Sequence, residues 1–201
     1  MQWFLDVLFP PRADERTLRG VTRDDMLTLV APRLVDYTRP GTVALLPFHH
    51  TLVRAALHEG KYHGSTHAFT LLAAGLAEYL HDDGDERFRK PLIIPVPLGK
   101  AREKARGFNQ VHEVLRHTGL DLDINAELLV RSRETTTQVG LPRETRERNL
   151  RGAFSTTGPL DPTLLYIVVD DVVTTGATLQ AAIDALKAAG ATHILPIALA
   201  H

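Results

Sequence analysis

The sequence predicts an α/β protein with a mostly parallel sheet flanked by helices, and three runs in its second half predict this. Residues 164–169 are apolar and rich in β-branched side chains, which is typical of a strand buried on both faces. An alanine-rich amphipathic run, 179–189, follows and ends at Gly190, as expected of a helix. Residues 194–200 are apolar again. Such strand–helix–strand alternation is typical of parallel strands joined by right-handed crossovers.

The rest of the chain supplies further elements of both kinds. Helices are expected near residues 3–8 (packed on the body or binding a partner), from Thr22 to about Tyr37, and over 52–57, 66–80 and 108–116. Strands are expected over residues 43–48, from 91 to about Ile94, and over 128–130. This order indicates a small N-terminal helical lobe, residues 1–42, followed by an α/β core, residues 43–201. Ligands of parallel sheets bind beyond the carboxyl ends of the strands, so the segments after Ile94, Val130 and Val169 should meet at one site.

The composition excludes several classes of function. The 23 basic and 24 acidic residues give a formal net charge of -1, which does not suggest general nucleic-acid binding but leaves a local basic patch open. There is no cysteine, so disulfides and thiolate zinc sites are excluded. The ten histidines contain no H-E-x-x-H motif, and we expect them in loops and at the surface. Metal binding by histidine stays open.

The sequence contains no run of eighteen apolar residues, so no membrane span is expected. The first residues lack the basic region, the long apolar region and the small-residue cleavage site of a secretory signal. We therefore expect a cytoplasmic protein.

Two acids and a hydroxyl-rich turn directly follow the buried run 164–169. Asp170 and Asp171 stand where the strand should leave its sheet, and the turn T-T-G-A-T, residues 174–178, precedes the helix. A glycine lets the backbone approach a phosphate closely, and the first amides of a helix have no acceptor within the helix. Carboxylates do not favourably face a phosphate, but they accept hydrogen bonds from vicinal hydroxyls. This order predicts a ligand with a phosphate at one end and a diol at the other, such as ribose 5-phosphate.

The same residues have a purely structural interpretation, in which Asp170 or Asp171 caps the following helix. Two adjacent acids together with the T-T-G-A-T turn make that interpretation the weaker one. A Walker-type loop is excluded because no G-K-[ST] is present, and the dinucleotide fingerprint G-x-G-x-x-G is also missing.

Two polar segments could complete a site at this edge of the sheet. The segment G-K-A-R-E-K-A-R-G-F-N-Q, residues 99–110, is either a solvated basic turn or a loop that offers Lys100, Arg102 and Arg106 to a pyrophosphate. The stretch 131–154 contains six arginines, and its length and polarity between two strands indicate a mobile arm.

The segment V-V-D-D-V-V-T-T-G-A-T, residues 168–178, resembles the binding motif for 5-phosphoribosyl-1-pyrophosphate (PRPP) in type I phosphoribosyltransferases. The resemblance implies the type I phosphoribosyltransferase fold, with Asp170 and Asp171 at the ribose 2- and 3-hydroxyls. It also implies that the 5-phosphate is held by Thr174, Thr175, Gly176, Ala177 and Thr178.

Three further segments, P-V-P-L-G-K-A-R-E-K-A-R-G-F-N-Q (95–110), the stretch 131–154 and H-E-G-K-Y-H-G (58–64), make residues 43–200 similar to the ComF branch of this superfamily. This resemblance implies PRPP bound with Mg2+, and the metal is held only indirectly by Asp170 and Asp171. The pyrophosphate loop would follow Ile94 and comprise Val96, Pro97 and Leu98 with the catalytic cations Lys100, Arg102 and Arg106. A flexible loop would close over the site and present Arg133 as a further catalytic cation, with Thr135, Gln138, Arg146 and Asn149.

The resemblance leaves two functions open. One is transfer of the 5-phosphoribosyl group to a nitrogen nucleophile, and the other is non-catalytic handling of single-stranded DNA or nucleotides together with competence-machinery proteins. ComF relatives usually carry a cysteine zinc module near the N-terminus, but Ala13 stands where its first cysteine is expected. Thr174 stands where purine-salvage enzymes have an acid, so the acceptor is not indicated. PRPP or a related phosphorylated sugar or nucleotide is the expected ligand, and a homo-oligomer stays open.

Overall fold

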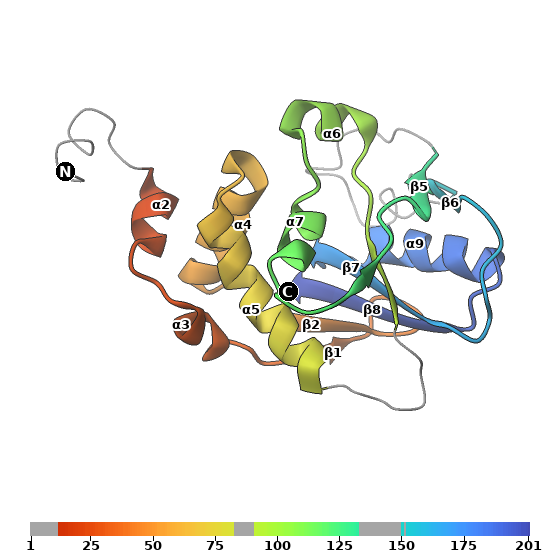
Figure 1. Ribbon diagram of the computed structural model, residues 1–201, viewed down its shortest axis with the longest axis horizontal. Coiled ribbons are helices and arrows are strands. Elements are labelled where there is room, and N and C mark those ends of the chain that lie inside the picture. Colours follow the sequence, from red (N-terminus) through yellow and green to blue (C-terminus); the bar gives the residue numbers. More distant parts are fainter. Residues whose placement is uncertain (1–11, 83–90, 133–149, 151) are drawn as a thin grey trace.

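The computed structural model describes residues 12–82, 91–132, 150 and 152–201, and it shows a mostly parallel sheet with helices on both faces (Figure 1). Within these residues β1 is antiparallel to β2, and every other pair of neighbouring strands in the main sheet is parallel. The predicted α/β class is therefore confirmed. The strand order across the main sheet is β1 (Arg33–Val35), β2 (Thr42–Leu46), β8 (His193–Ala200), β7 (Leu165–Val172), β3 (Leu92–Pro95) and β4 (Asp123–Ile124).

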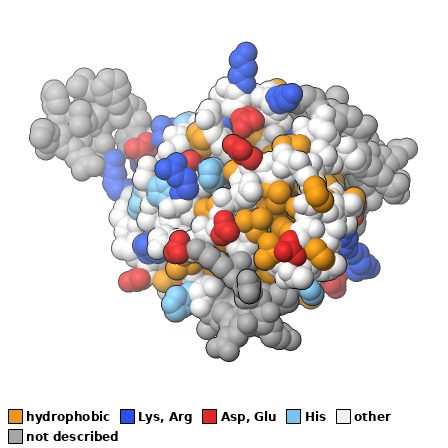
Figure 2. Space-filling view, turned by 45° about the vertical axis from the view of Figure 1, so that its right-hand side comes forward, with side chains coloured by type: hydrophobic (Ala, Val, Ile, Leu, Met, Phe, Trp, Pro, Cys, Tyr) orange, Lys and Arg blue, Asp and Glu red, His pale blue; other side chains and the backbone are white. Residues whose placement is uncertain are grey.

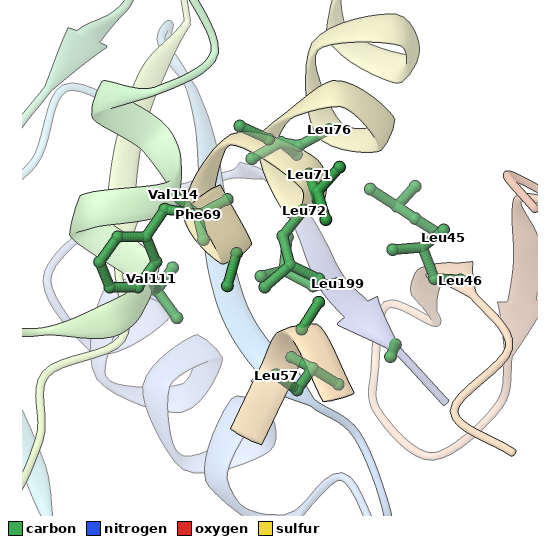
Figure 3. Close-up of a cluster of buried hydrophobic side chains, with 14 of the residues drawn as sticks. Leu45, Leu46, Leu57, Phe69, Leu71, Leu72, Leu76, Val111, Val114 and Leu199 are labelled. Atoms are coloured by element: carbon green, nitrogen blue, oxygen red, sulfur yellow. The ribbon is translucent and has the colours of Figure 1, made fainter. Parts of the chain in front are cut away.

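Strand β7 lies inside the sheet and is buried on both faces, as its unbroken apolar run predicts. Successive side chains point to opposite faces, so Ile167 and Val169 join one apolar cluster while Tyr166 and Val168 join the other. The first cluster, drawn in Figure 3, lies beneath the helices α4 (Thr51–His63), α5 (Thr66–Asp82) and α7 (Gln110–Arg116). The second lies against α9 (Ala177–Ala188).

The expected strand at residues 128–130 does not lie in the main sheet. It forms β5 (Leu129–Arg131), which pairs antiparallel with β6 (Phe154–Thr156) in a separate two-stranded ribbon packed against α9. The expectation that these residues form a strand of the main sheet was therefore wrong, whereas the loop expected to reach the site lies mostly outside the described residues and stays a prediction. A three-residue strand carries no sequence signal that selects its partner, and the partner segment β6 lies beyond the long polar stretch.

The helix expected from Thr22 to about Tyr37 is much shorter. It begins at Thr22, whose side chain accepts from the Asp25 amide in a capping box, but α3 (Arg23–Leu27) is its whole length. Pro32 cannot continue a helix, and the next residues form β1 instead. Because β1 pairs with β2, it joins the sheet across the expected division between residues 42 and 43. That division stays a prediction.

Two other segments are more helical than expected. Helix α4 continues past Leu57 through the H-E-G-K-Y-H segment and ends at Gly64, which has the left-handed φ of +61°. The basic segment after β3 is not a loop, because α6 (Lys100–Arg106) forms between Gly99 and Gly107. Its residues Lys, Ala, Arg and Glu are strong helix formers. Figure 2 shows Lys and Arg side chains standing out at the top of the molecule, where α6 lies in Figure 1.

Helix α2 (Ala13–Leu18) packs on α4 through a buried carboxylate. Glu59 of α4 is only 2% exposed in its side chain, and both of its oxygens accept from Arg12 at 3.0 and 2.6 Å. This fork lowers the pKa of Glu59 below its ordinary value of 4.5, against the opposing effect of burial. The ion pair therefore fixes the start of α2 to α4.

Replacing Arg12 by alanine should destabilise the protein by about 1–3 kcal/mol at pH 7, because it leaves the buried Glu59 carboxylate without its counter-ion. The stabilisation depends on an ionised Glu59 with a lowered pKa, so it is present above pH 4.5 and is lost as the pH falls through the folded-state pKa. Urea unfolding at several pH values measures this difference. Arg16→Ala on the exposed side of α2 is the control, and an equal loss in both variants would contradict the prediction.

Within the described ranges, none of the helices combines the length and the apolar character that crossing a bilayer requires.

Candidate functional site

The two predicted acids lie at the carboxyl end of β7, one facing each side of the sheet. Both carboxylates are anchored locally, because Asp170 Oδ1 accepts from the amide of Asp171 at 2.9 Å and Asp171 Oδ1 accepts from the amide of Val172 at 2.7 Å. Asp170 lines a small depression of about 30 Å³, whereas Asp171 lines a larger cavity of about 570 Å³. Because successive side chains of a strand point to opposite faces of the sheet, the two acids line two different hollows.

The hydroxyl-rich turn forms the walls of the smaller hollow. The residues that line it beside Asp170 are Val172, Val173, Thr174, Thr175, Gly176, Ala177, Thr178 and Leu179. Helix α9 begins directly after Gly176, and its first internal hydrogen bond runs from the Gln180 amide to the Gly176 carbonyl at 2.8 Å. The amides before Gln180 have no acceptor within the helix, so this end of the helix favours an anion. Asp170, predicted to bind a diol, and the turn, predicted to bind a phosphate, therefore line one hollow.

Gly176 is required at its position for two independent reasons. Its φ is +75°, and a Cβ placed on it would lie 2.7 Å from Tyr37 Cβ and 2.8 Å from the Tyr37 carbonyl oxygen. The Tyr37 segment is itself held on α9, because the Arg39 amide donates to Gln180 Oε1 and Lys187 Nζ donates to the Arg39 carbonyl, both at 2.7 Å. Tyr37 was not predicted to lie at this turn, since no local sequence pattern connects it with a segment so far along the chain.

Polar side chains from three helices, α4, α6 and α7, form a network that leads to Asp171. Gln110 Nε2 and Lys61 Nζ both donate to Asp171 Oδ2, at 2.8 and 3.2 Å. The amide oxygen of Gln110 in turn accepts from the guanidinium of Arg106. The Arg106 guanidinium also lies 5.8 Å from the centre of the Tyr62 ring. Gln110 was not among the predicted site residues, although its position in the first turn of a helix after R-G-F-N was a signal that could have found it.

Burial and the neighbouring charge of Asp171 raise the pKa of Asp170 from 3.8 to about 7, with burial the larger cause. The Lys61 ammonium and the Asp171 amide act in the opposite direction. One of the two adjacent carboxyls is thus readily protonated near neutral pH, because two like charges at close range cannot both be favoured.

This raised pKa predicts that stability falls as the pH rises. The folded state binds the Asp170 proton more tightly than the unfolded state, so the contribution is complete below pH 3.8 and is lost as the pH rises through about 7. Asp170→Asn should therefore gain stability relative to wild type by roughly 1–3 kcal/mol between pH 4 and 8, a value reduced for the partial exposure of the residue. Denaturant unfolding at pH 4.5, 6 and 8 measures the gain. Asp184→Asn, an exposed change on α9, should show no such gain at any of these pH values. If the free energies of unfolding of wild type and Asp170→Asn depend on pH in the same way, the raised pKa of Asp170 is contradicted.

The segment after β3 meets the end of β7, as expected for adjacent parallel strands. The amide of Val96 donates to the Val169 carbonyl at 2.8 Å, and Asn109 Nδ2 donates to the Val96 carbonyl at 2.9 Å. Val96 is buried, and Pro97 and Leu98 are half-buried. Lys100 and Arg102 are exposed on α6. Burial lowers the pKa of Arg106, and the Asp171 carboxylate opposes this effect.

The residues expected to close over the site cannot be placed. Arg133, Thr135, Gln138, Arg146 and Asn149 all lie outside the described residues, as does the helix expected near residues 3–8. Their roles stay predictions.

One histidine-containing group was not expected from the sequence. Donor atoms of His58, Glu59 and His63 lie within 4.8 Å of one another on α4. The Glu59 carboxylate is already held by Arg12, and His58 Nδ1 lies 2.8 Å from an Asp14 oxygen. These contacts within the protein account for the cluster.

Comparison with known proteins gives relatives in sequence and in structure. No family model matches the chain. A protein of Shigella flexneri named DNA utilization protein YhgH is 35% identical over 122 residues, which are 59% of this chain and 53% of that protein. The protein of the same name from Salmonella typhi is 37% identical over 105 residues, which are 51% of this chain and 45% of that protein. The chain therefore spans about half the length of the curated relatives it matches.

Among solved structures, a hypoxanthine phosphoribosyltransferase from Staphylococcus aureus aligns with a TM-score of 0.38 and 12% sequence identity, covering 67% of this chain and 63% of that one.

Proposed function

We propose that the protein binds PRPP and transfers its 5-phosphoribosyl group to a nitrogen nucleophile, releasing pyrophosphate. The observation that carries this proposal is the single hollow at the end of β7 that Asp170 shares with the threonine-glycine turn. The carboxylate can accept hydrogen bonds from ribose hydroxyls, and the turn offers hydroxyls and helix amides to a phosphate. A ligand that has both groups fits this order of donors and acceptors.

Asp171 extends the diol site and is held in place for that role. Lys61 and Gln110 both donate to its Oδ2, which fixes the side chain and supplies a compensating positive charge. An oriented carboxylate binds a hydroxyl without a further loss of side-chain freedom. The arrangement therefore favours ribose over a sugar that lacks one hydroxyl.

The proposed reaction is a displacement at C1 of the ribose. The lone pair of the acceptor nitrogen forms the new bond to C1, while the C1–O bond breaks and its electron pair leaves on the pyrophosphate. Lys100, Arg102 and Arg106 are the cations proposed to bind the leaving group. The site also has the carboxylate oxygens that suit a hard cation, and Asp170 and Asp171 would hold Mg2+ indirectly through the ligand. When bound, Mg2+ would supply positive charge at the pyrophosphate.

Isothermal titration of the full chain with PRPP and Mg2+ tests the proposal, and a saturable heat is expected. Ribose 5-phosphate and 2-deoxyribose 5-phosphate are matched ligands that differ by one hydroxyl, and the ribose form should bind more tightly by roughly 10-fold. Pyrophosphate release with a panel of nitrogen bases then tests turnover. Absence of any heat with PRPP would refute the proposal.

A second function is supported by the curated relatives, which are named DNA utilization proteins. In this alternative the fold is that of a non-catalytic, ComF-type competence protein that holds nucleotides or single-stranded DNA during DNA uptake. Salt-sensitive binding of a single strand without pyrophosphate release would favour it, because phosphate contacts weaken steeply with salt. Turnover of PRPP with a base would exclude it.

A further inference from the structure

The large cavity beside Asp171 has features that the proposed PRPP site does not use. It measures about 570 Å³, within the range of about 300–1,000 Å³ that is typical of small-molecule pockets. One wall is a face of α4 that presents Thr51, Arg54, His58, Lys61 and Tyr62, and Phe48 lies before that helix. These α4 positions recur at helical spacing, so the helix turns one polar face to the cavity and the opposite face to the apolar core.

Two exposed aromatic rings line this cavity, one before the start of α4 and one in its last turn. Phe48 is 41% exposed and Tyr62 is 61% exposed, and both line it. In the described part of the chain only Leu34 and Val130 are other large apolar side chains exposed to a similar degree. Exposed rings at the mouth of a cavity offer flat apolar surface to a planar ligand.

Of the basic side chains that line the cavity, all but one lie beside a carboxylate. Lys61 is paired with Asp171 at 3.2 Å, and His58 is paired with Asp14 at 2.8 Å. Among the residues that the structure describes, the Arg54 guanidinium has neither an ion pair nor a side-chain hydrogen bond. The group that complements this wall is therefore an anion, and a guanidinium binds a carboxylate through two parallel hydrogen bonds.

We propose that this cavity binds a planar heteroaromatic acid, with its ring against Phe48 and its carboxylate on Arg54. As the acceptor it would lie beside the diol acids, and this role rests on the proposed function, whereas the binding itself does not. A small ligand fits better than a nucleic-acid strand, because a strand needs several phosphate contacts and the cavity has one uncompensated cation.

Matched ligand pairs test the charge requirement. Pyridine, pyrimidine and purine carboxylates, each compared with its neutral carboxamide, are titrated into the full chain by calorimetry. At least one carboxylate should bind about 10-fold more tightly than its carboxamide, the size expected of one charge-assisted contact. Arg54→Gln should abolish this preference, and Arg54→Lys should restore part of it. Arg116→Gln, an exposed change on α7, should leave it intact.

Phe48→Ala separates the ring contact from the charge contact. It should weaken the carboxylate and the carboxamide by a similar factor, because the stacking surface serves both. A preference that is absent from wild type, or that persists in Arg54→Gln, would overturn the inference. Competition by a short oligothymidylate with a steep salt dependence would also overturn it, in favour of a strand.

The same samples distinguish this inference from the proposed function. If PRPP binds but no carboxylate is preferred, the cavity inference alone fails. If a carboxylate is preferred through Arg54 but PRPP gives no heat, the proposed function fails and the ligand class of the cavity stands.

Discussion

Replacing Gly176 by alanine should destabilise the protein by roughly 2–4 kcal/mol and abolish phosphate binding at the turn. The left-handed φ of +75° costs an L-residue about 1–2 kcal/mol, and a Cβ within 2.8 Å of the Tyr37 carbonyl oxygen adds an overpacking cost of about 1–3 kcal/mol. The segment cannot easily retreat, because Arg39 is held on α9 by hydrogen bonds with Gln180 and Lys187. Denaturant unfolding measures the first effect, and titration with ribose 5-phosphate measures the second.

Gly158→Ala is the matched control, since its φ is not positive and no heavy atom lies within 4 Å of the position that the new methyl group would take. Its stability should stay within about 0.5 kcal/mol of wild type, as for ordinary surface changes. Equal stability of Gly176→Ala and wild type would show that the turn does not pack against Tyr37.

Replacing Asp171 by asparagine should weaken PRPP binding by roughly 10–100-fold, because hydrogen bonds to a charged acceptor are worth about 1.5–3 kcal/mol. The change also leaves Lys61 without its anionic partner and removes one acceptor from Gln110. The loss should appear in calorimetry with PRPP and Mg2+, and it should be much smaller for 2-deoxyribose 5-phosphate than for ribose 5-phosphate.

Asp24→Asn on α3 is a suitable control, since it removes an exposed carboxylate remote from β7 and should leave PRPP binding unchanged. Lys61→Ala should weaken PRPP binding less than Asp171→Asn does. In the proposed site Lys61 only orients the Asp171 carboxylate, whereas the carboxylate itself accepts the hydrogen bond from the ribose. An Asp171→Asn variant that binds PRPP as tightly as wild type would remove Asp171 from the proposed site.

Several elements could be predicted because their signals are local. The run 164–169 is apolar throughout because β7 is buried on both faces, and the positions of Asp170 and Asp171 follow from where that run ends. Helix α5 was predicted nearly to its ends, since its apolar spacing covers most of its length. The turn at 174–178 was predicted to hold a phosphate; the structure places all five of its residues around one depression, and the phosphate itself stays a prediction.

Other elements depend on contacts between distant residues and were missed. The helix expected to reach Tyr37 ends at Leu27, because residues after it form the edge strand β1, which pairs with β2. Val130 pairs with Ser155 in the separate ribbon, a choice that its own sequence does not specify. The basic segment 100–106 became a helix, although its glycines and charges had indicated a loop.

By itself, the sequence determined the order of chemistry along one strand: apolar residues, then two acids, then a turn of hydroxyls around a glycine. Contacts that close only on folding determined the surroundings of those acids, with Gln110 and Lys61 brought to Asp171, Tyr37 brought behind Gly176, and Arg54 brought to the wall of a cavity. The physical reason is the distance along the sequence over which each kind of interaction acts. Burial on both faces and turn chemistry act between near neighbours in the chain, whereas hydrogen bonds and close packing join residues whose separation in sequence carries no pattern.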